Sequence, residues 1–304
     1  MQGAGDRIDI QRVAVIGAGT MGAQIAARSA YAGKTVALHD AFEGALDRCS
    51  ERIDREILPA IERSEQLSGS ISDARARLRT ATSLQDAVQG VDLVIEAVRE
   101  EIDVKRQVFR DLSALTGAIL ATNSSSLPSS LLVDAVDHPE RVVNMHFFAP
   151  IWVRTMLEVM SCGRTSDDVI EAAMAYGRDL GLTAAAVRGQ SKGFIINRIW
   201  RAVKRESLRV VDEEVADPED VDRLWMLFFQ TEYPPFGIMD MVGLDVVEDI
   251  EASYQAVTRD PADTPSSVLR QKVQAGELGE KSGKGFYSHP DPAYQQTDFL
   301  KSVG

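Results

Sequence analysis

The chain has 304 residues, of which 44% are hydrophobic and 26% charged, as is usual for a globular protein large enough for two domains. Its 46 acidic residues outnumber 33 lysines and arginines, for a formal charge of −13. Such a surface repels nucleic acids and anionic membranes, so we expect neither as a partner. No segment is apolar for the roughly 18 residues of a membrane span. The only cysteines, Cys49 and Cys162, indicate reduced thiols in the cytoplasm rather than a disulfide framework.

Residues 12–40 predict a strand, a glycine-rich turn, a helix and a second strand ending in an acid. Gly17 permits the tight turn, Gly19 lets the backbone approach a pyrophosphate, and Gly22 allows close packing of the helix. The pyrophosphate would lie at the helix N-terminus, where free N–H groups favour negative charge. Asp40 stands where the acid that binds an adenosine ribose is expected, which predicts NAD rather than NADP. The residues expected at the dinucleotide are Gly17, Gly19, Thr20, Met21, Gly22 and Asp40.

Strands and helices alternate through the first two thirds of the chain, which predicts an α/β fold: a Rossmann-type, doubly wound, mostly parallel sheet. A helical pair over residues 41–79 is expected to turn at Gly69 and project from the sheet. The remaining elements are strands at 91–97, 118–122, 141–148, 156–160 and 184–187, and a helix at 103–115.

The pattern changes near residue 191. Residues 194–215 predict a long helix, Asp217 and Pro218 mark the start of another, and no convincing strand follows up to residue 277. We expect three segments: a disordered leader over 1–9, an NAD-binding domain over 10–190, and an all-helical C-terminal domain over 191–304. Such a helical domain is a candidate for pairing with its own copy.

Oxidation of an alcohol needs a base for the hydroxyl proton, and His146 is the candidate. Among the four histidines, it alone ends an apolar strand, where the carboxyl edge of a parallel sheet opens onto its crevice. Glu158, an acid in the next apolar run, would fix the tautomer and stabilise the protonated ring. The alternative is a core histidine with a structural glutamate, and spacing alone does not choose between them.

The sequence resembles the L-3-hydroxyacyl-CoA dehydrogenase family, which includes the 3-hydroxybutyryl-CoA dehydrogenases, over nearly its whole length. The segments that carry the resemblance are 17–22, 94–97, 104–105, 122–127, 146–148, 157–159, 193–198 and 281–287. It implies an NAD-dependent oxidoreductase of fatty acid metabolism that uses no metal. It also implies a homodimer formed through the helical domain, with NAD and a small-molecule substrate bound between the domains.

The resemblance also implies residue roles. His146 would be the general base and Glu158 its orienting partner, Ser125 would bind the substrate oxygen, and Asn197 would hold the substrate. Three further residues match positions that line the cofactor: Glu100, Lys105 and Lys281. Two alternatives stay open: Glu100 and Lys105 could be solvated charges at the start of a helix, and the serines beside Ser125 compete for its role.

Three departures from the family pattern bear on the substrate. Ala149 replaces the usual asparagine of His-Phe-Phe-Asn-Pro, and Trp152 replaces a smaller residue, either narrowing the pocket or packing at the domain junction. The projecting helices mix Arg52, Arg55 and Arg63 with many acids, which weakens a site for the phosphates of CoA. We still expect a 3-hydroxyacyl thioester of CoA as the substrate, and these departures keep a carrier-protein thioester or a free hydroxy acid open as the alternative. A non-catalytic, cofactor-binding role is a third hypothesis, against which the four matched catalytic positions argue.

Overall fold

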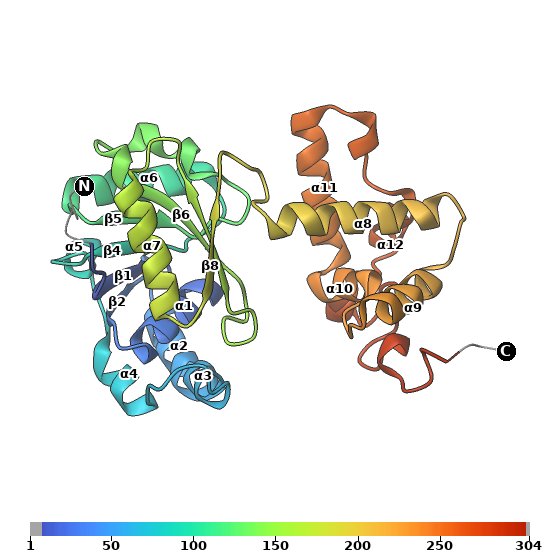
Figure 1. Cartoon of the computed structure of the whole chain (residues 1–304), viewed down its shortest axis with the longest axis horizontal. Helices are drawn as coiled ribbons and strands as arrows, with labels where there is room; N and C mark the ends of the chain where they lie inside the picture. The colour runs from blue at the N-terminus through green and yellow to red at the C-terminus, as the bar shows by residue number, and fades with distance from the viewer. Residues whose placement is uncertain (1–7, 302–304) are drawn as a thin grey trace, which may run out of the picture. The chain divides into compact units, whose positions relative to one another are not determined.

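The computed structural model describes residues 8–301 and divides the chain into two compact units after Ile195 (Figure 1). Residues 1–7 of the predicted leader lie outside the described residues. Ile8, the next residue, packs against the core of the first unit. The division falls a few residues beyond the expected 190/191 boundary because Phe194 and Ile195 pack with Met160 and Val187, which lie near the ends of two strands of the first unit.

The described part of the first unit alternates strands with helices, as the sequence predicts. Its elements are β1 (Arg12–Ile16), α1 (Thr20–Tyr31), β2 (Thr35–His39), α2 (Ala45–Arg52), the π-helical turn η1 (Ile53–Ile57), α3 (Leu58–Arg63), α4 (Ile71–Arg77), β3 (Leu78–Thr80), α5 (Leu84–Ala87), β4 (Leu93–Glu96), α6 (Ile102–Leu115), β5 (Ile119–Thr122), the 3₁₀ turns η2 (Ser129–Leu131), η3 (Val133–Ala135) and η4 (Pro139–Arg141), β6 (Val142–Phe147), β7 (Met156–Ser161), α7 (Asp167–Asp179) and β8 (Thr183–Val187).

The strands form one eight-stranded sheet in the order β3-β2-β1-β4-β5-β6-β7-β8. All pairs are parallel except β6 with β7, which is antiparallel. The order reverses at β1, where β2 and β4 flank it, and a doubly wound sheet binds its ligand at the carboxyl edge of such a point. The predicted Rossmann-type fold is confirmed.

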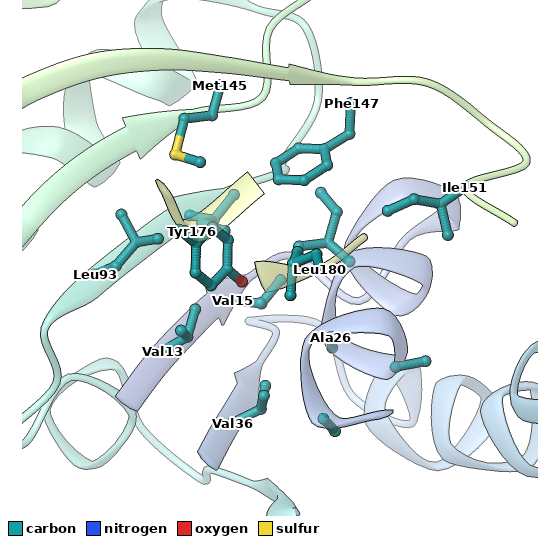
Figure 2. Packing of buried hydrophobic residues seen from close by; sticks show 14 of the residues in the cluster. Val13, Val15, Ala26, Val36, Leu93, Met145, Phe147, Ile151, Tyr176 and Leu180 are labelled. Atoms are coloured by element: carbon teal, nitrogen blue, oxygen red, sulfur yellow. The ribbon is translucent and has the colours of Figure 1, made fainter. Parts of the chain in front are cut away.

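Alternation along the strands separates two buried layers. Val13 and Val15 of β1 lie in a layer with α1 and α7, whereas Ala14 and Ile16 lie in a layer with α5 and α6. Figure 2 shows part of the first layer, where Val13 and Val15 gather with Tyr176 of α7. The face that a strand residue occupies therefore decides which helix it can meet.

Three local predictions are wrong in their bounds. The projecting helix begins at Ala45 rather than at residue 41, because Gly44 is left-handed (φ 68°) and precedes the first turn. The second helix of the pair ends at Arg77, and Leu78 opens the unpredicted edge strand β3. The long helix α8 (Ile196–Asp212) begins after Phe194, whose φ of 52° is incompatible with a right-handed helix.

The described part of the second unit is helical and has its own core, in which Phe236, Met239 and Leu244 are fully buried. Asp217 and Pro218 start a helix as predicted. Its elements after α8 are α9 (Pro218–Phe229), α10 (Pro235–Val242), α11 (Leu244–Thr258), the 3₁₀ turn η5 (Pro261–Asp263), α12 (Ser267–Gln274), and the 3₁₀ turns η6 (Glu280–Ser282) and η7 (Ala293–Gln295).

Across residues 8–301, none of the helices combines the length and the apolar composition that crossing a bilayer would require.

Candidate active site

The glycine-rich turn between β1 and α1 has the shape that a dinucleotide needs. Gly17 has φ 108°, and a Cβ there would lie 2.6 Å from the carbonyl oxygen of Ala97. A Cβ on Gly22 would lie 1.8 Å from the carbonyl oxygen of Gly17, so the first turn of α1 packs directly on the loop. A Cβ on Gly19, by contrast, would meet no atom within 4 Å. The loop is thus closed on its protein side and open where a pyrophosphate would approach.

The start of α1 supports the same fit. Gly19 caps the helix without a side-chain hydrogen bond, so no cap side chain competes for the first N–H groups. Thr20 is exposed and Met21 half-buried there. A cavity of about 540 Å³ lies beside the loop, between the ends of β1 and β2 and the first turns of α6. The residues present therefore fit the adenosine half of a dinucleotide.

Asp40 follows β2 and lines this cavity. Its Oδ2 accepts a hydrogen bond from the N–H of Ala18 (2.7 Å), and its Oδ1 accepts one from the N–H of Phe42 (2.9 Å). These two bonds hold the half-buried carboxylate against the glycine loop. Each oxygen keeps acceptor capacity for a ribose hydroxyl.

His146 and Glu158 are brought together by the antiparallel pairing of β6 and β7, in which they are register partners. The imidazole Nδ1 lies 2.9 Å from Oε2 of Glu158, and both side chains are about 95% buried. The other carboxylate oxygen accepts the N–H of Ile195 (3.0 Å). An ionised carboxylate only accepts, so Nδ1 carries the proton and Nε2 is left as the acceptor.

The ring of His146 is also fixed by its aromatic neighbours. Its centroid lies 4.1 Å from that of Phe148 and 5.2 Å from that of Phe194, the latter stacked at 28°. Within residues 8–301, Nε2 makes no hydrogen bond to protein. The ring borders a cavity of about 360 Å³ that Met21, Ser125 and Ala149 also line. The basic nitrogen is therefore available to a ligand in this cavity.

The two cavities share Ala97 and Val98, which follow β4 at the carboxyl edge of the sheet. A single elongated ligand that crosses this edge would place one end beside Asp40 and the other beside His146.

The serine loop, residues 124–126 after β5, has three hydroxyls that could bind the substrate oxygen, and their hydrogen bonds distinguish them. Ser124 donates to Oε1 of Glu100, and Ser126 donates to the same oxygen from both its hydroxyl (2.8 Å) and its N–H (3.1 Å). Ser125 is exposed, lines the cavity at His146, and has no hydrogen bond to any described residue. Only the hydroxyl of Ser125 is free for a ligand.

Lys105 is not a solvated charge, so that alternative is wrong for Lys105, whereas the Glu100 side chain keeps 38% of its surface exposed while it pairs with Lys105. Lys105 is 1% exposed, and its ammonium lies 2.8 Å from Glu96 and 3.2 Å from Glu100. Burial raises the pKa of Glu100, but the charge of Lys105 and hydrogen bonds from Ser124 and Ser126 outweigh it and keep that pKa below its usual value. Both residues line the cavity at His146.

Two predicted site residues, Asn197 and Lys281, belong to the second unit. Asn197 is half-buried in the first turn of α8. The ammonium of Lys281 pairs with both carboxylate oxygens of Asp245, which holds the pKa of that acid below its usual value.

Two of the three departures from the family pattern can be followed in the first unit. Trp152 packs against the core of the first unit and is not among the residues that line the cavity at His146. Arg52 donates to the carbonyl oxygen of Gly19 (2.9 Å), and Arg55 pairs with Glu51 (2.6 Å). These two arginines are thus already engaged within the protein.

Sequence reasoning missed Glu96 and Asn144, both fully buried at the site. Glu96 contacts Lys105, and the side-chain amide of Asn144 donates to the carbonyl oxygens of Thr122 (2.8 Å) and Ser124 (3.1 Å). A signal was present, because each is a strongly polar residue inside an otherwise apolar strand. The two thiols take no part: both are buried, and burial raises the pKa of Cys49 to about 11.

A Rossmann-type sheet with an open glycine turn, an acid after β2 and a buried histidine–carboxylate pair defines a nicotinamide-dependent dehydrogenase. The family models for the NAD-binding and C-terminal domains of 3-hydroxyacyl-CoA dehydrogenase match residues 12–190 and 193–289. The chain therefore belongs to the 3-hydroxyacyl-CoA dehydrogenase family and is an NAD-dependent oxidoreductase, as the sequence predicts.

Two relatives illustrate the likeness. A probable 3-hydroxybutyryl-CoA dehydrogenase from Deinococcus radiodurans is 34% identical over 90% of this chain and 99% of its own. The crystal structure of (S)-3-hydroxybutyryl-CoA dehydrogenase from Ralstonia eutropha superposes with a TM-score of 0.86 at 30% identity, covering 93% of this chain and all of that one. A third relative, from Mesorhizobium japonicum, is 31% identical over 92% of this chain and 91% of its own, and is named a 5-formyl-3-hydroxy-2-methylpyridine 4-carboxylate 5-dehydrogenase.

Proposed function

We propose that this protein interconverts 3-hydroxyacyl-CoA and 3-ketoacyl-CoA with His146 as general base and acid and Glu158 as its orienting partner. The observation that carries the proposal is the Nδ1–Oε2 contact of 2.9 Å between two buried side chains, which leaves Nε2 as the acceptor of a ring that borders a cavity. A histidine held in this tautomer accepts a proton at Nε2 and is stabilised as the imidazolium by the carboxylate behind it.

In the oxidative direction, Nε2 of His146 takes the proton of the substrate C3 hydroxyl while C3 loses a hydride. Bound NAD supplies the hydride acceptor. The positive charge formed on the imidazole is balanced by Glu158, whose second oxygen stays bonded to the N–H of Ile195. In the reductive direction the imidazolium returns the proton to the oxygen at C3.

The free hydroxyl of Ser125 is proposed to bind the oxygen at C3 in both directions. We propose by family resemblance that Asn197 holds the substrate. By the same resemblance we propose that the cofactor contacts the glycine turn and four charged residues, Asp40, Glu100, Lys105 and Lys281. The position of Asp40 and the open space at Gly19 are the observations that best support a binding site for the adenosine half of the cofactor.

We also propose that the protein is a homodimer that works in the cytoplasm. The second unit exposes a row of large apolar side chains on α9, a kind of patch that marks interaction surfaces. Phe228 is 80% exposed and Leu224 66% exposed, with Leu227 and Phe229 beside them. A second copy of the chain, as the family likeness implies, would cover this row.

The activity is tested by following NADH consumption with acetoacetyl-CoA, acetoacetate and an acetoacetyl carrier protein in parallel. We expect turnover with the CoA thioester at a kcat/KM at least about tenfold above the other two. Turnover with acetoacetate alone would refute the thioester as substrate. No turnover with any of the three would support the non-catalytic hypothesis instead.

A further inference from the structure

Three buried polar residues form a row across three neighbouring strands of the sheet. Glu96 ends β4, Thr122 ends β5 and Asn144 lies in β6, and the register pairs Glu96 with Thr122 and Thr122 with Asn144. All three are 0% exposed. Alternation places Glu96 on the face that α6 covers, because its neighbour Val94 lies in the α6 layer and Ile95 in the opposite one.

Glu96 is the most heavily bonded member of the row. Its Oε1 accepts the N–H of Val98 (2.7 Å) and the ammonium of Lys105 (2.8 Å). Its Oε2 accepts the hydroxyl of Thr122 (2.7 Å) and the same ammonium (3.1 Å). A fully buried carboxylate is costly unless it is paired and hydrogen-bonded, and here both oxygens are satisfied by three different segments.

One route leads from Glu96 to the serine loop through charges. Lys105 bridges Glu96 and Glu100, and Oε1 of Glu100 accepts hydrogen bonds from Ser124 and Ser126, the residues on each side of Ser125. The position of Glu100 therefore sets the position of both flanking serines.

A second route is shorter and runs through the sheet. Thr122 donates its hydroxyl to Glu96, and its oxygen accepts the N–H of Ser124 (3.2 Å). Asn144 then holds the carbonyl oxygens of Thr122 and Ser124 from the neighbouring strand. The backbone before Ser125 is thus fastened to the row directly.

We propose that Glu96 is a positioning residue that fixes the serine loop, and with it the hydroxyl of Ser125, through Thr122 on one route and Lys105 with Glu100 on the other. The proposal rests on the proposed function in one respect, since it takes Ser125 as the group that binds the substrate oxygen. Glu96 itself does not line the cavity at His146 and touches no reacting atom.

The effect of removing the charge follows from the contacts. In Glu96→Gln the shape is kept, but the amide nitrogen replaces one of two acceptor oxygens. It would face the ammonium of Lys105 in either position, together with the N–H of Val98 in place of Oε1 or the hydroxyl of Thr122 in place of Oε2. Lys105 then keeps Glu100 as its only anionic partner among the described residues. We expect both routes to loosen while the fold remains.

A double-mutant cycle tests whether Glu96 acts through Ser125. Glu96→Gln should lower kcat for acetoacetyl-CoA reduction, measured at saturating NADH, by about tenfold or more. In a Ser125→Ala background the same change should lower kcat by less than about twofold. Equal loss in both backgrounds would overturn the proposal, and so would a loss confined to NADH affinity.

Tyr176→Phe serves as a matched control for the loss of a buried hydrogen bond in the same unit. It removes the bond between Ser29 and Tyr176 in the opposite layer and should leave kcat within about twofold of the wild type. If Glu96→Gln does not fold, Thr122→Val cuts the shorter route without removing a charge. Thr122→Val should also lower kcat strongly in the wild-type background and by less than about twofold in the Ser125→Ala background. An equal loss of kcat in both backgrounds would overturn the proposal.

Amide hydrogen exchange separates failure of this proposal from failure of the proposed function, because it needs no turnover. In Glu96→Gln we expect faster exchange in a peptide covering residues 123–127, with no change in one covering α7. Unchanged exchange at 123–127 would refute the positioning role even if the enzyme is active. If the wild type reduces no ketone but exchange increases as expected, the proposed function fails and the positioning of the loop stands.

Discussion

His146 and Glu158 face each other across the one antiparallel pair in the described sheet, with the imidazole Nδ1 2.9 Å from the carboxylate. Their contact is set by the backbone ladder of two buried strands rather than by a loop. Register pairs in an antiparallel sheet stay within a narrow range of separations, so the ring is oriented before any ligand binds.

Replacing the base should abolish most of the chemistry without removing the cofactor. For His146→Gln we expect kcat to fall by about 10³- to 10⁴-fold, because no group remains at Nε2 to take the proton. The dissociation constant of NADH, measured by fluorescence titration, should change less than about threefold. Glu158→Gln keeps a hydrogen-bond acceptor but loses the negative charge, so kcat should fall less, by about 10- to 100-fold. Wild-type turnover in His146→Gln would show that another group is the base.

Asp40 should control the choice of nicotinamide cofactor. Asp40→Ala removes a carboxylate that would repel a 2′-phosphate, and it also releases the N–H groups of Ala18 and Phe42. We expect the ratio of kcat/KM for NADPH to that for NADH to rise at least about tenfold. An unchanged ratio would mean that the ribose is bound elsewhere.

Loss of the Ser125 hydroxyl should lower activity more than loss of a nearby serine hydroxyl outside the cavity. Ser125→Ala removes the one free hydroxyl of the serine loop, and we expect kcat/KM for the ketoacyl substrate to fall by about 10- to 100-fold. Ser130→Ala, in η2 and away from the cavity lining, should be indistinguishable from the wild type. Equal effects of the two changes would contradict the role given to Ser125.

A charge on the exposed row of α9 should separate the proposed dimer. Phe228→Glu places a carboxylate where an apolar contact is expected, so the molar mass by light scattering should fall from twice 33.2 kDa to once that value. Leu131→Glu, an exposed apolar site on the first unit, is the control and should not change the mass. A monomeric wild type would refute the homodimer.

Asp222 should make the second unit less stable as the pH rises. Burial raises the pKa of this carboxyl from 3.8 to about 6, despite hydrogen bonds from the backbone of Phe236 and Gly237 and from Tyr287. The folded state therefore binds the proton of Asp222 more tightly than the unfolded state. The stabilisation that this proton gives to the folded state is complete below about pH 4 and is lost as the pH passes 6.

The difference between Asp222→Asn and the wild type isolates this effect from other carboxylates. Relative to the variant, the wild type should lose up to about 3 kcal/mol of unfolding free energy between about pH 4 and 7, as measured by urea unfolding. A parallel pH dependence of the two proteins would exclude Asp222 as the cause.

Part of the site was predictable because its signals are local in the chain. The glycine turn, the helix after it and the acid after the second strand lie within residues 12–40, and each has its own steric reason. The roles of Ser124 and Ser126 were not predictable, because they depend on Glu100, which approaches from the loop before α6. The same is true of Lys105, whose burial no helical pattern indicated.

By itself the sequence determined the fold class, most of the strands and the helix after the glycine turn in the first unit, and the turn that suits a dinucleotide, since periodicity and glycine sterics act over a few residues. The tertiary structure alone decided that β6 and β7 run antiparallel and bring His146 to Glu158. It also decided that Glu96, Thr122 and Asn144 share one row behind the serine loop. Such alignments depend on register between strands that are far apart in the chain, and register is fixed only when the strands pack together.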